Sequence, residues 1–267
     1  MPELPDVESF RRYLDATSLH RRIAHVHVAD ARILHGISAR GLHRRLTGRR
    51  MEATRRHGKH LLARLDDATW LTLHFGMTGR LKAFEDMADD PRYDRVRFDF
   101  EDGNHLAYEN RRMLGRVGMA DNVEAFIKAE GLGPDALDPA FDEAAFAAAV
   151  GKRRGLAKAA LMDQTLLAGV GNIYADEILF QAGLHPKAKL QDLDAARLAR
   201  LYRTMRAVLQ TAIDRGAGSE ELVERLPPSY LLPHREKGAK CPRCGGAIQV
   251  LKISGRSACF CPRCQPE

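Results

Sequence analysis

Residues 241–264 read CPRCGGAIQVLKISGRSACFCPRC, and this stretch decides how the end of the chain folds. Two cysteine pairs, Cys241 with Cys244 and Cys261 with Cys264, each enclose two residues, and sixteen residues separate the pairs. This spacing is typical of two knuckles that together form a tetrahedral zinc site. Because four thiolates complete the coordination shell, no position stays open for substrate or water. The predicted Zn2+ is therefore structural and not catalytic.

The residues between the cysteine pairs predict a β-hairpin. Residues 247–253 and 257–260 are the expected strands, and Ser254-Gly255-Arg256 is the expected tip, which would present a cation away from the metal. The fifth cysteine, Cys259, has no place in a tetrahedral shell of four. We expect it to pack within its strand.

The composition of the whole chain is that of a globular protein with a polyanionic partner. The 267 residues correspond to about two domains, and 45% hydrophobic with 29% charged residues excludes a disordered chain. A net charge of +7 and a pI near 9.3 favour nucleic acid as the partner. With no long apolar run and no basic, apolar leader at the N-terminus, we expect a cytoplasmic protein with no membrane partner.

The first half of the chain predicts a β-sandwich behind a leading helix. Short segments with strand composition recur between residues 23 and 119, where Val26 and Val28 alternate with histidines. Asp102-Gly103 lies between two such segments and is typical of a hairpin turn. We predict residues 1–130 as the N-terminal domain.

The second half predicts helices. Residues 131–139, rich in Gly and Pro, are the expected linker, after which the composition turns to Ala and Leu with helical periodicity. The expected helices span residues 141–150, 156–163, 173–182 and 193–213. The predicted domains are a helical one over 131–225 and the zinc hairpin over 226–267. The fold class is thus α+β.

Two further segments are candidates for DNA contacts. Residues 164–177, QTLLAGVGNIYADE, predict two helices around a glycine turn, with Asn172 capping the second helix and its amides free to meet a phosphate. A purely structural helix-turn-helix explains this segment as well. The basic run of residues 55–60, RRHGKH, is the other candidate, although such a run by itself is most often a solvated strand face.

The N-terminus offers a nucleophile. Removal of Met1 would leave Pro2 as a free secondary amine, which can attack a sugar carbon and form an iminium. Glu3 is adjacent and could act as general acid or base. The alternative is ordinary chemistry at the start of a helix, where Pro and an acidic residue are both common.

Together these motifs resemble the formamidopyrimidine-DNA glycosylase / endonuclease VIII family of base-excision repair enzymes. The opening PELPDVE, the segment from Gly169 to Glu177 and the four cysteines that end in CPRCQ resemble the catalytic N-terminus, the helix-two-turn-helix and the zinc finger of that family. The motifs are far apart and occur in the family's order, so the resemblance covers the chain from end to end.

The resemblance implies a role for each matching residue. Pro2 would attack the deoxyribose C1′, Glu3 would protonate the sugar ring oxygen or otherwise shuttle protons, and Lys59 would contact phosphate and assist catalysis. His74, Asn172 and Arg256 would hold phosphates around the extruded nucleotide. Met77, Arg112 and Leu114 would fill the gap that the flipped base leaves, since a vacated stack needs an apolar wedge and a polar reader of the orphan base.

Two positions depart from the formamidopyrimidine branch of the family. Leu114 stands where that branch usually has Phe, and residues 216–228, with their acids and prolines, do not match the Gly/Thr-rich loop that covers a flipped 8-oxoguanine. These departures predict weak excision of 8-oxoguanine beside clear cleavage at abasic sites.

The resemblance implies a bifunctional DNA glycosylase and abasic-site lyase. It would bind damaged double-stranded DNA as a monomer in the cleft between its domains and nick the abasic site by β,δ-elimination. The alternative is a non-catalytic zinc-finger protein that binds damaged DNA, in which a retained Met1 blocks Pro2.

Overall fold

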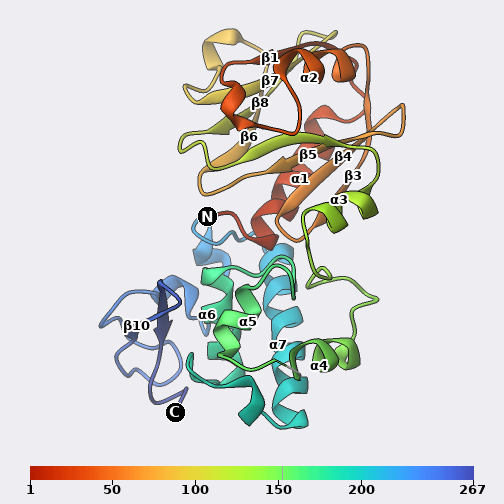
Figure 1. The fold of residues 1–267 in the computed structure, drawn as a ribbon. Helices are drawn as coiled ribbons and strands as arrows, with labels where there is room; N and C mark the ends of the chain where they lie inside the picture. The colour runs from red at the N-terminus through yellow and green to blue at the C-terminus, as the bar shows by residue number, and fades with distance from the viewer. Residues whose placement is uncertain (152) are drawn as a thin grey trace. The chain divides into compact units, whose positions relative to one another are not determined.

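The computed structural model describes residues 1–151 and 153–267, which divide into two compact units. The first comprises Met1–Pro2 and Val7–Glu130, and the second comprises Glu3–Asp6 and Gly131–Glu267 (Figure 1). Helix α1 (Leu4–Ser18) therefore begins in the second unit and continues in the first. The segment beside the candidate nucleophile is thus part of the helical unit.

The first unit is built from two β-sheets. The four-stranded sheet has the order β1 (Ile23–Val28), β7 (Asp94–Phe100), β8 (His105–Asn110), β6 (Gly79–Phe84). The five-stranded sheet has the order β2 (Leu34–His35), β9 (Arg116–Ala120), β5 (Trp70–His74), β4 (His60–Leu65), β3 (Met51–His57). All neighbours are antiparallel except β2 and β9. The predicted sandwich with a leading helix is confirmed.

The strands follow the alternation of apolar residues. In β7, Val96, Phe98 and Phe100 are buried, and they pack in one core with Leu106 of β8. The β7–β8 hairpin turns at Asp102-Gly103 as predicted, with Gly103 at φ +83°.

Two helices of this unit were not predicted: α2 (Ala39–Leu46) and α3 (Val123–Ala129). Helix α2 has eight residues, buries Leu42 and Leu46, and starts where the Ser38 hydroxyl accepts the Gly41 N–H at 3.1 Å. A helix this short carries little periodicity, so its cap is the stronger signal.

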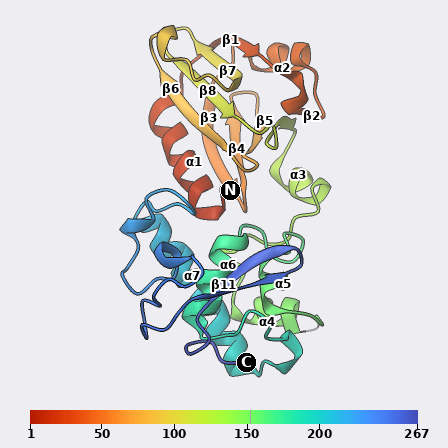
Figure 2. The same cartoon turned by 90° about the vertical axis from the view of Figure 1, so that its left-hand side faces the viewer.

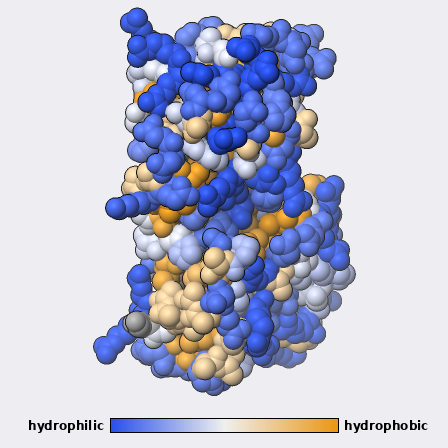
Figure 3. Space-filling model, turned by 90° about the vertical axis from the view of Figure 1, so that its right-hand side faces the viewer, coloured by the Kyte–Doolittle hydropathy of each residue, from blue (hydrophilic) through white to orange (hydrophobic). Residues whose placement is uncertain are grey.

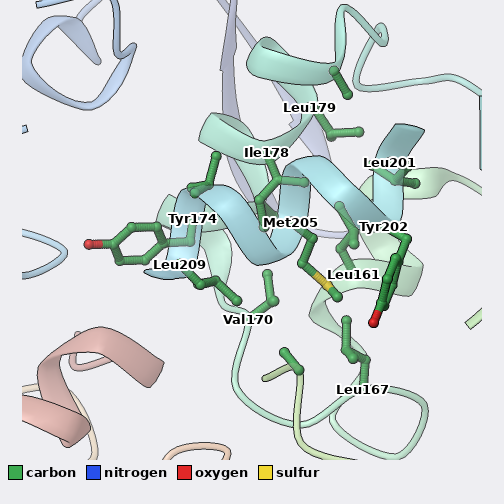
Figure 4. Close-up of a cluster of buried hydrophobic side chains, with 14 of the residues drawn as sticks. Leu161, Leu167, Val170, Tyr174, Ile178, Leu179, Leu201, Tyr202, Met205 and Leu209 are labelled. Atoms are coloured by element: carbon green, nitrogen blue, oxygen red, sulfur yellow. The ribbon is translucent and has the colours of Figure 1, made fainter. Parts of the chain in front are cut away.

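The second unit contains the four predicted helices, with ends shifted by one or two residues. They are α4 (Glu143–Gly151), α5 (Ala157–Met162), α6 (Asn172–Ala182) and α7 (Ala195–Asp214). Leu201, Met205 and Leu209 of α7 form a buried stripe, and Figure 4 shows them among side chains of α6 such as Tyr174 and Ile178. Short 3₁₀ helices lie in the first unit at Ala31–Ile33 and Met87–Asp89, and in the second unit at Leu190–Asp192, Val223–Arg225 and Leu232–His234.

The expected linker is not a free connection. The Gly133 N–H donates to the Gln164 carbonyl at 2.8 Å, and the Ala136 N–H donates to the Ala168 carbonyl at 3.0 Å. Ala136 is fully buried. The segment packs against the turn before α6. At Gly133 a Cβ would come within 2.7 Å of that turn's backbone, so this close packing requires glycine there.

The C-terminal hairpin consists of β10 (Gln249–Ile253) and β11 (Arg256–Phe260), which lies beside α6 (Figure 2). Its two turn residues, Ser254 and Gly255, have φ of +48° and +76°, as tight hairpins require. Arg256 is therefore the first residue of β11 and not part of the turn. Cys259 is buried in the strand, which confirms its predicted packing role.

The surface shown in Figure 3 is largely hydrophilic over the first unit, whereas apolar side chains gather on the second unit. Within the described ranges no helix has the length and apolar character needed to cross a membrane.

Candidate active site and nucleic-acid interface

Glu3 is fully buried and its carboxylate lies at the N-terminus of α6. Oε2 accepts the N–H groups of Gly171 at 2.7 Å and Tyr174 at 3.2 Å, and Oε1 accepts that of Ile173 at 2.8 Å. These are amides that a helix leaves unpaired at its start, where the helix dipole also favours negative charge. Glu3 and the glycine turn that ends at Gly171, 168 residues later, therefore form one site.

This arrangement corrects the prediction made for Asn172. Gly171, and not Asn172, is the cap of α6, and Asn172 is the first helical residue. Glu3 occupies the amides that were expected to be free for a phosphate. The Asn172 side chain is half-buried, and among the described residues its Oδ1 has no hydrogen-bond partner. The start of α6 is thus occupied by Glu3 and is not available to a phosphate.

The turn before α6 is closed by Gln164. Its side-chain amide donates to the Val170 carbonyl at 2.8 Å, and its oxygen accepts the Gly169 N–H at 3.0 Å. Gly169 has φ +120°, and a Cβ there would meet Leu4 at 2.5 Å. The Leu4 N–H donates to the Gly169 carbonyl at 3.1 Å. Glycine at this position therefore lets the N-terminal segment lie directly on the turn.

Lys59 and His74 lie close together in the first unit. Lys59 follows Gly58 in the two-residue turn between β3 and β4. Only 9% of Lys59 is exposed, so the interpretation of residues 55–60 as a solvated strand face is wrong for this residue. Burial, together with the charges of Lys59 and Arg116, lowers the pKa of His74 to about 4. A neutral imidazole beside a buried cation can donate an N–H to a phosphate.

His60, a residue that the sequence analysis did not single out, packs against His74 with ring centroids 4.8 Å apart. Burial and the neighbouring His74 lower its pKa to about 3. His60 could have been found from its position directly opposite His74 in the neighbouring strand. That position is known only once β4 is known to pair with β5.

The three predicted gap-filling residues lie on two loops that touch. Met77 and Leu114 are 39% and 50% exposed, unusual values for large apolar side chains, and Arg112 is also exposed. The Arg112 N–H donates to the Thr78 hydroxyl at 3.1 Å. At Gly76 a Cβ would come within 2.4 Å of the Leu114 carbonyl. The two loops thus form one exposed apolar and cationic tip.

Tyr108 and Asn110, which sequence reasoning missed, hold these loops in place. The Tyr108 hydroxyl donates to the His74 carbonyl at 2.7 Å, and the Asn110 amide donates to the Phe75 carbonyl at 3.1 Å. Both side chains are buried, and at Gly115 a Cβ would overlap the Tyr108 hydroxyl. They fix the backbone that leads to Met77.

Cys241, Cys244, Cys261 and Cys264 hold one structural zinc. Their four sulfur atoms all lie within 4.8 Å of one another. The Sγ atoms of Cys241 and Cys264 are 3.8 Å apart, and those of Cys244 and Cys261 are 3.4 Å apart. Tetrahedral Zn–S bonds of about 2.3 Å require sulfur separations of about 3.8 Å, so the cluster fits the ion.

A buried ion cluster ties the zinc hairpin to the helices. Asp176 of α6 pairs through Oδ1 with Lys158 at 2.6 Å and through Oδ2 with Arg235 at 2.7 Å. Asp176 also accepts the Cys259 N–H at 3.0 Å, and Lys158 donates to the Ser257 carbonyl at 2.7 Å. The strand that begins at the exposed Arg256 is therefore held from its buried side. Neither Lys158 nor Arg235 belongs to a motif, which is why sequence reasoning missed them.

Comparison with known proteins agrees with this geometry. Residues 1–117 match the formamidopyrimidine-DNA glycosylase N-terminal domain, residues 132–223 match its H2TH domain, and residues 238–266 match the zinc finger found in FPG and IleRS. The formamidopyrimidine-DNA glycosylase of Geobacter metallireducens is 38% identical over 99% of this chain and 100% of its own length. That of Acidothermus cellulolyticus is 38% identical over 100% and 98%.

Solved structures give the same result. The Lactococcus lactis enzyme bound non-covalently to DNA with an abasic site has a TM-score of 0.89, 30% identity and coverage of 99% of this chain and 100% of its own. A MutM complex with DNA that contains carbocyclic 8-oxo-G has a TM-score of 0.90 and 30% identity, with full coverage of both chains. The chain belongs to the formamidopyrimidine-DNA glycosylase family.

Proposed function

We propose that this chain, a DNA glycosylase and abasic-site lyase of base excision repair, uses Pro2 as its nucleophile and Glu3 as the proton-transferring group beside it. The observation that carries the proposal is the Glu3 carboxylate, which is fully buried and held by three backbone amides, in the residue that follows Pro2 in the chain. A carboxylate held in one orientation next to the nucleophile in the chain is suited to transfer a proton.

In the proposed reaction the free Pro2 nitrogen is a secondary amine with a single proton. It bonds to C1′ as the bond from C1′ to the base breaks, and the departing base takes a proton from solvent. The single Pro2 proton then passes to the ring oxygen as the bond from C1′ to that oxygen breaks and the sugar opens, which leaves an iminium. Loss of a C2′ proton breaks the 3′ C–O bond, a second elimination breaks the 5′ C–O bond, and water releases Pro2.

The surroundings of Glu3 favour one of its two expected roles. Three N–H donors and the start of a helix stabilise the ionised carboxylate. Glu3 is thus better suited to carry the Pro2 proton to the ring oxygen, and to stabilise the cationic iminium, than to act as a permanently protonated acid.

DNA is held by residues of both units in this proposal. Lys59 and His74 contact the phosphates next to the extruded nucleotide, and Asn172 and Arg256 contact them from the helical unit. The exposed tip of Met77, Arg112 and Leu114 enters the duplex where the base has left. The exposure of these three side chains supports this role, because a wedge must be accessible before it can enter the duplex.

The finer assignments follow from the same residues. The proposed domains remain 1–130, 131–225 and 226–267. We also propose that the protein acts as a monomer in the cytoplasm. Known complexes of relatives hold Fapy-dG or an 8-oxo-G analogue. We propose abasic sites and either ring-opened purines or oxidised pyrimidines as the preferred substrates here, with 8-oxoguanine weaker, because residues 216–228 do not match the 8-oxoguanine cover and Leu114 gives less stacking than Phe.

Borohydride reduction tests the proposal. Processed protein that lacks Met1 should give a stable covalent adduct with abasic-site duplex DNA, and Pro2→Gly should lose most of it. Abundant adduct from protein that retains Met1 would refute the amine as nucleophile. Tight binding to damaged DNA with no adduct from processed protein would support the non-catalytic alternative instead.

A further inference from the structure

Asp6 joins two segments that lie more than 200 residues apart in the chain. Its Oδ2 accepts the Glu3 N–H at 2.8 Å, and its Oδ1 accepts the Ser219 N–H at 2.9 Å. At Gly218 a Cβ would lie 2.4 Å from the same Oδ1, so that only glycine allows this approach. The carboxylate is thus seated between the backbone of Glu3 and the loop after α7.

A second contact holds the same loop from α6. The Tyr174 hydroxyl donates to the Gly218 carbonyl at 3.1 Å, while the Tyr174 N–H donates to Glu3 Oε2 at 3.2 Å. Glu3, Tyr174, the loop at 218–219 and Asp6 therefore form a closed ring of hydrogen bonds. Tyr174 is fully buried, which makes the ring a fixed part of the unit.

The loop that this ring holds continues to an exposed apolar residue, Leu222. The Gly218 N–H donates to the Glu221 carbonyl at 2.9 Å, and Leu222, at φ +56°, leaves 43% of its surface exposed. This is the segment whose sequence departs from the family's 8-oxoguanine cover. A short turn with an exposed apolar residue, linked through Asp6 to the Glu3 backbone, is suited to contact a flipped base.

From this ring we infer that Asp6 is a positioning residue for base excision, which sets the loop 216–222 and the Glu3 backbone in one fixed relationship. The inference rests on the proposed function, because it assigns the loop to the flipped base. Asp6 does not touch the reacting atoms. It acts through Glu3 and through the loop, so its loss should affect a substrate that carries a base more than one that has none.

The test compares two substrates in single-turnover assays with full-length, zinc-loaded protein. One duplex carries a ring-opened purine, and the other carries a preformed abasic site. Asp6→Asn should lower base release about tenfold, the effect of weakening one charge-assisted hydrogen bond. Strand cleavage at the abasic site should stay within about twofold, because no base needs to be held.

Two further variants make the result specific. Tyr174→Phe keeps the N–H to Glu3 and removes the hydroxyl contact to the loop, so it should show the same split, and it serves as the test if Asp6→Asn does not fold. Asp214→Asn makes the same chemical change on an exposed residue at the end of α7 and should alter neither rate.

The outcomes separate the inference from the proposed function. An equal loss of both rates in Asp6→Asn and Tyr174→Phe, or no loss in either, overturns the positioning role. Unaltered processed protein that forms no borohydride adduct overturns the proposed function, whereas an adduct together with unchanged rates in the variants overturns the inference alone.

Discussion

The Glu3 carboxylate accepts the N–H of Ile173 at 2.8 Å, a contact across 170 residues of chain. Two motifs that look independent in the sequence, the N-terminal PEL and the glycine turn at 169–171, are therefore one structure. Glu3 fills the helix start that would otherwise bind an anion, and it does so from the position next to Pro2. The helix-two-turn-helix thus holds the residue that we propose for proton transfer.

Glu3→Gln should impair base release and leave binding to damaged DNA measurable. Glutamine keeps the size of the side chain but loses the charge and one acceptor, so that one of three amides lacks its partner. We expect a loss of about 1–3 kcal/mol in the free energy of unfolding and a larger relative loss in the single-turnover rate. Denaturant unfolding, binding and kinetics measure the three quantities, and an equal fall in binding and rate would indicate a purely structural role.

Arg256→Ala should retain zinc and weaken DNA binding. The residue is exposed at the start of β11, while Cys261 of the metal site follows the other end of that strand. Loss of one phosphate contact should reduce the slope of log K against log salt by about 0.9. Cys244→Ala is the comparison, because it should lose zinc and affinity together. An unchanged slope in Arg256→Ala would place this side chain away from the DNA backbone.

The lesion preference should follow the departures at Leu114 and in residues 216–228. We expect the abasic site and a ring-opened purine to be processed faster than 8-oxoguanine in parallel single-turnover assays. Leu114→Phe should strengthen binding to duplexes with a flipped base by about 0.5–1.5 kcal/mol, through stacking. Removal of 8-oxoguanine as the fastest of the bases would show that another segment supplies its cover.

Asp94 should make the protein less stable as the pH rises. Burial, together with the charges of Asp90 and Asp99, raises its pKa to about 7, although Arg97 opposes the shift. The pKa of an aspartate in the unfolded chain is about 3.9. Between pH 3.9 and pH 7 the folded state therefore keeps a proton that the unfolded state has lost, so the free energy of unfolding falls as the pH rises through this range. Asp94→Asn should remove the loss. Its stability relative to the unaltered protein should rise on the order of 2 kcal/mol from pH 5 to pH 8, as measured by urea unfolding, and a constant difference would contradict this assignment.

The elements with strong local signals could be predicted from the sequence. The four cysteines, the Asp102-Gly103 turn and the apolar stripe of α7 each depend on residues close together in the chain. Helix α2 is the counterexample, since eight residues carry too little periodicity and only Ser38 marks its start.

The contacts that assemble the site could not be predicted in this way. Asn172 was a reasonable cap by residue type, but the amides of α6 bind Glu3, a residue that no local rule relates to them. Lys158 and Arg235 lie in unremarkable stretches and have a role only because both pair with Asp176. Such contacts depend on the tertiary fold, and only the resemblance to a family could anticipate the roles of the residues involved.

The central claim is that the Pro2 nitrogen carries the covalent intermediate, and peptide mapping of the borohydride-reduced adduct tests it most directly. After nuclease and protease digestion, mass spectrometry should find the sugar remnant on the N-terminal peptide that begins at Pro2, with Met1 absent. A remnant on the peptide that contains Lys59, with the N-terminal peptide unmodified, would contradict the account.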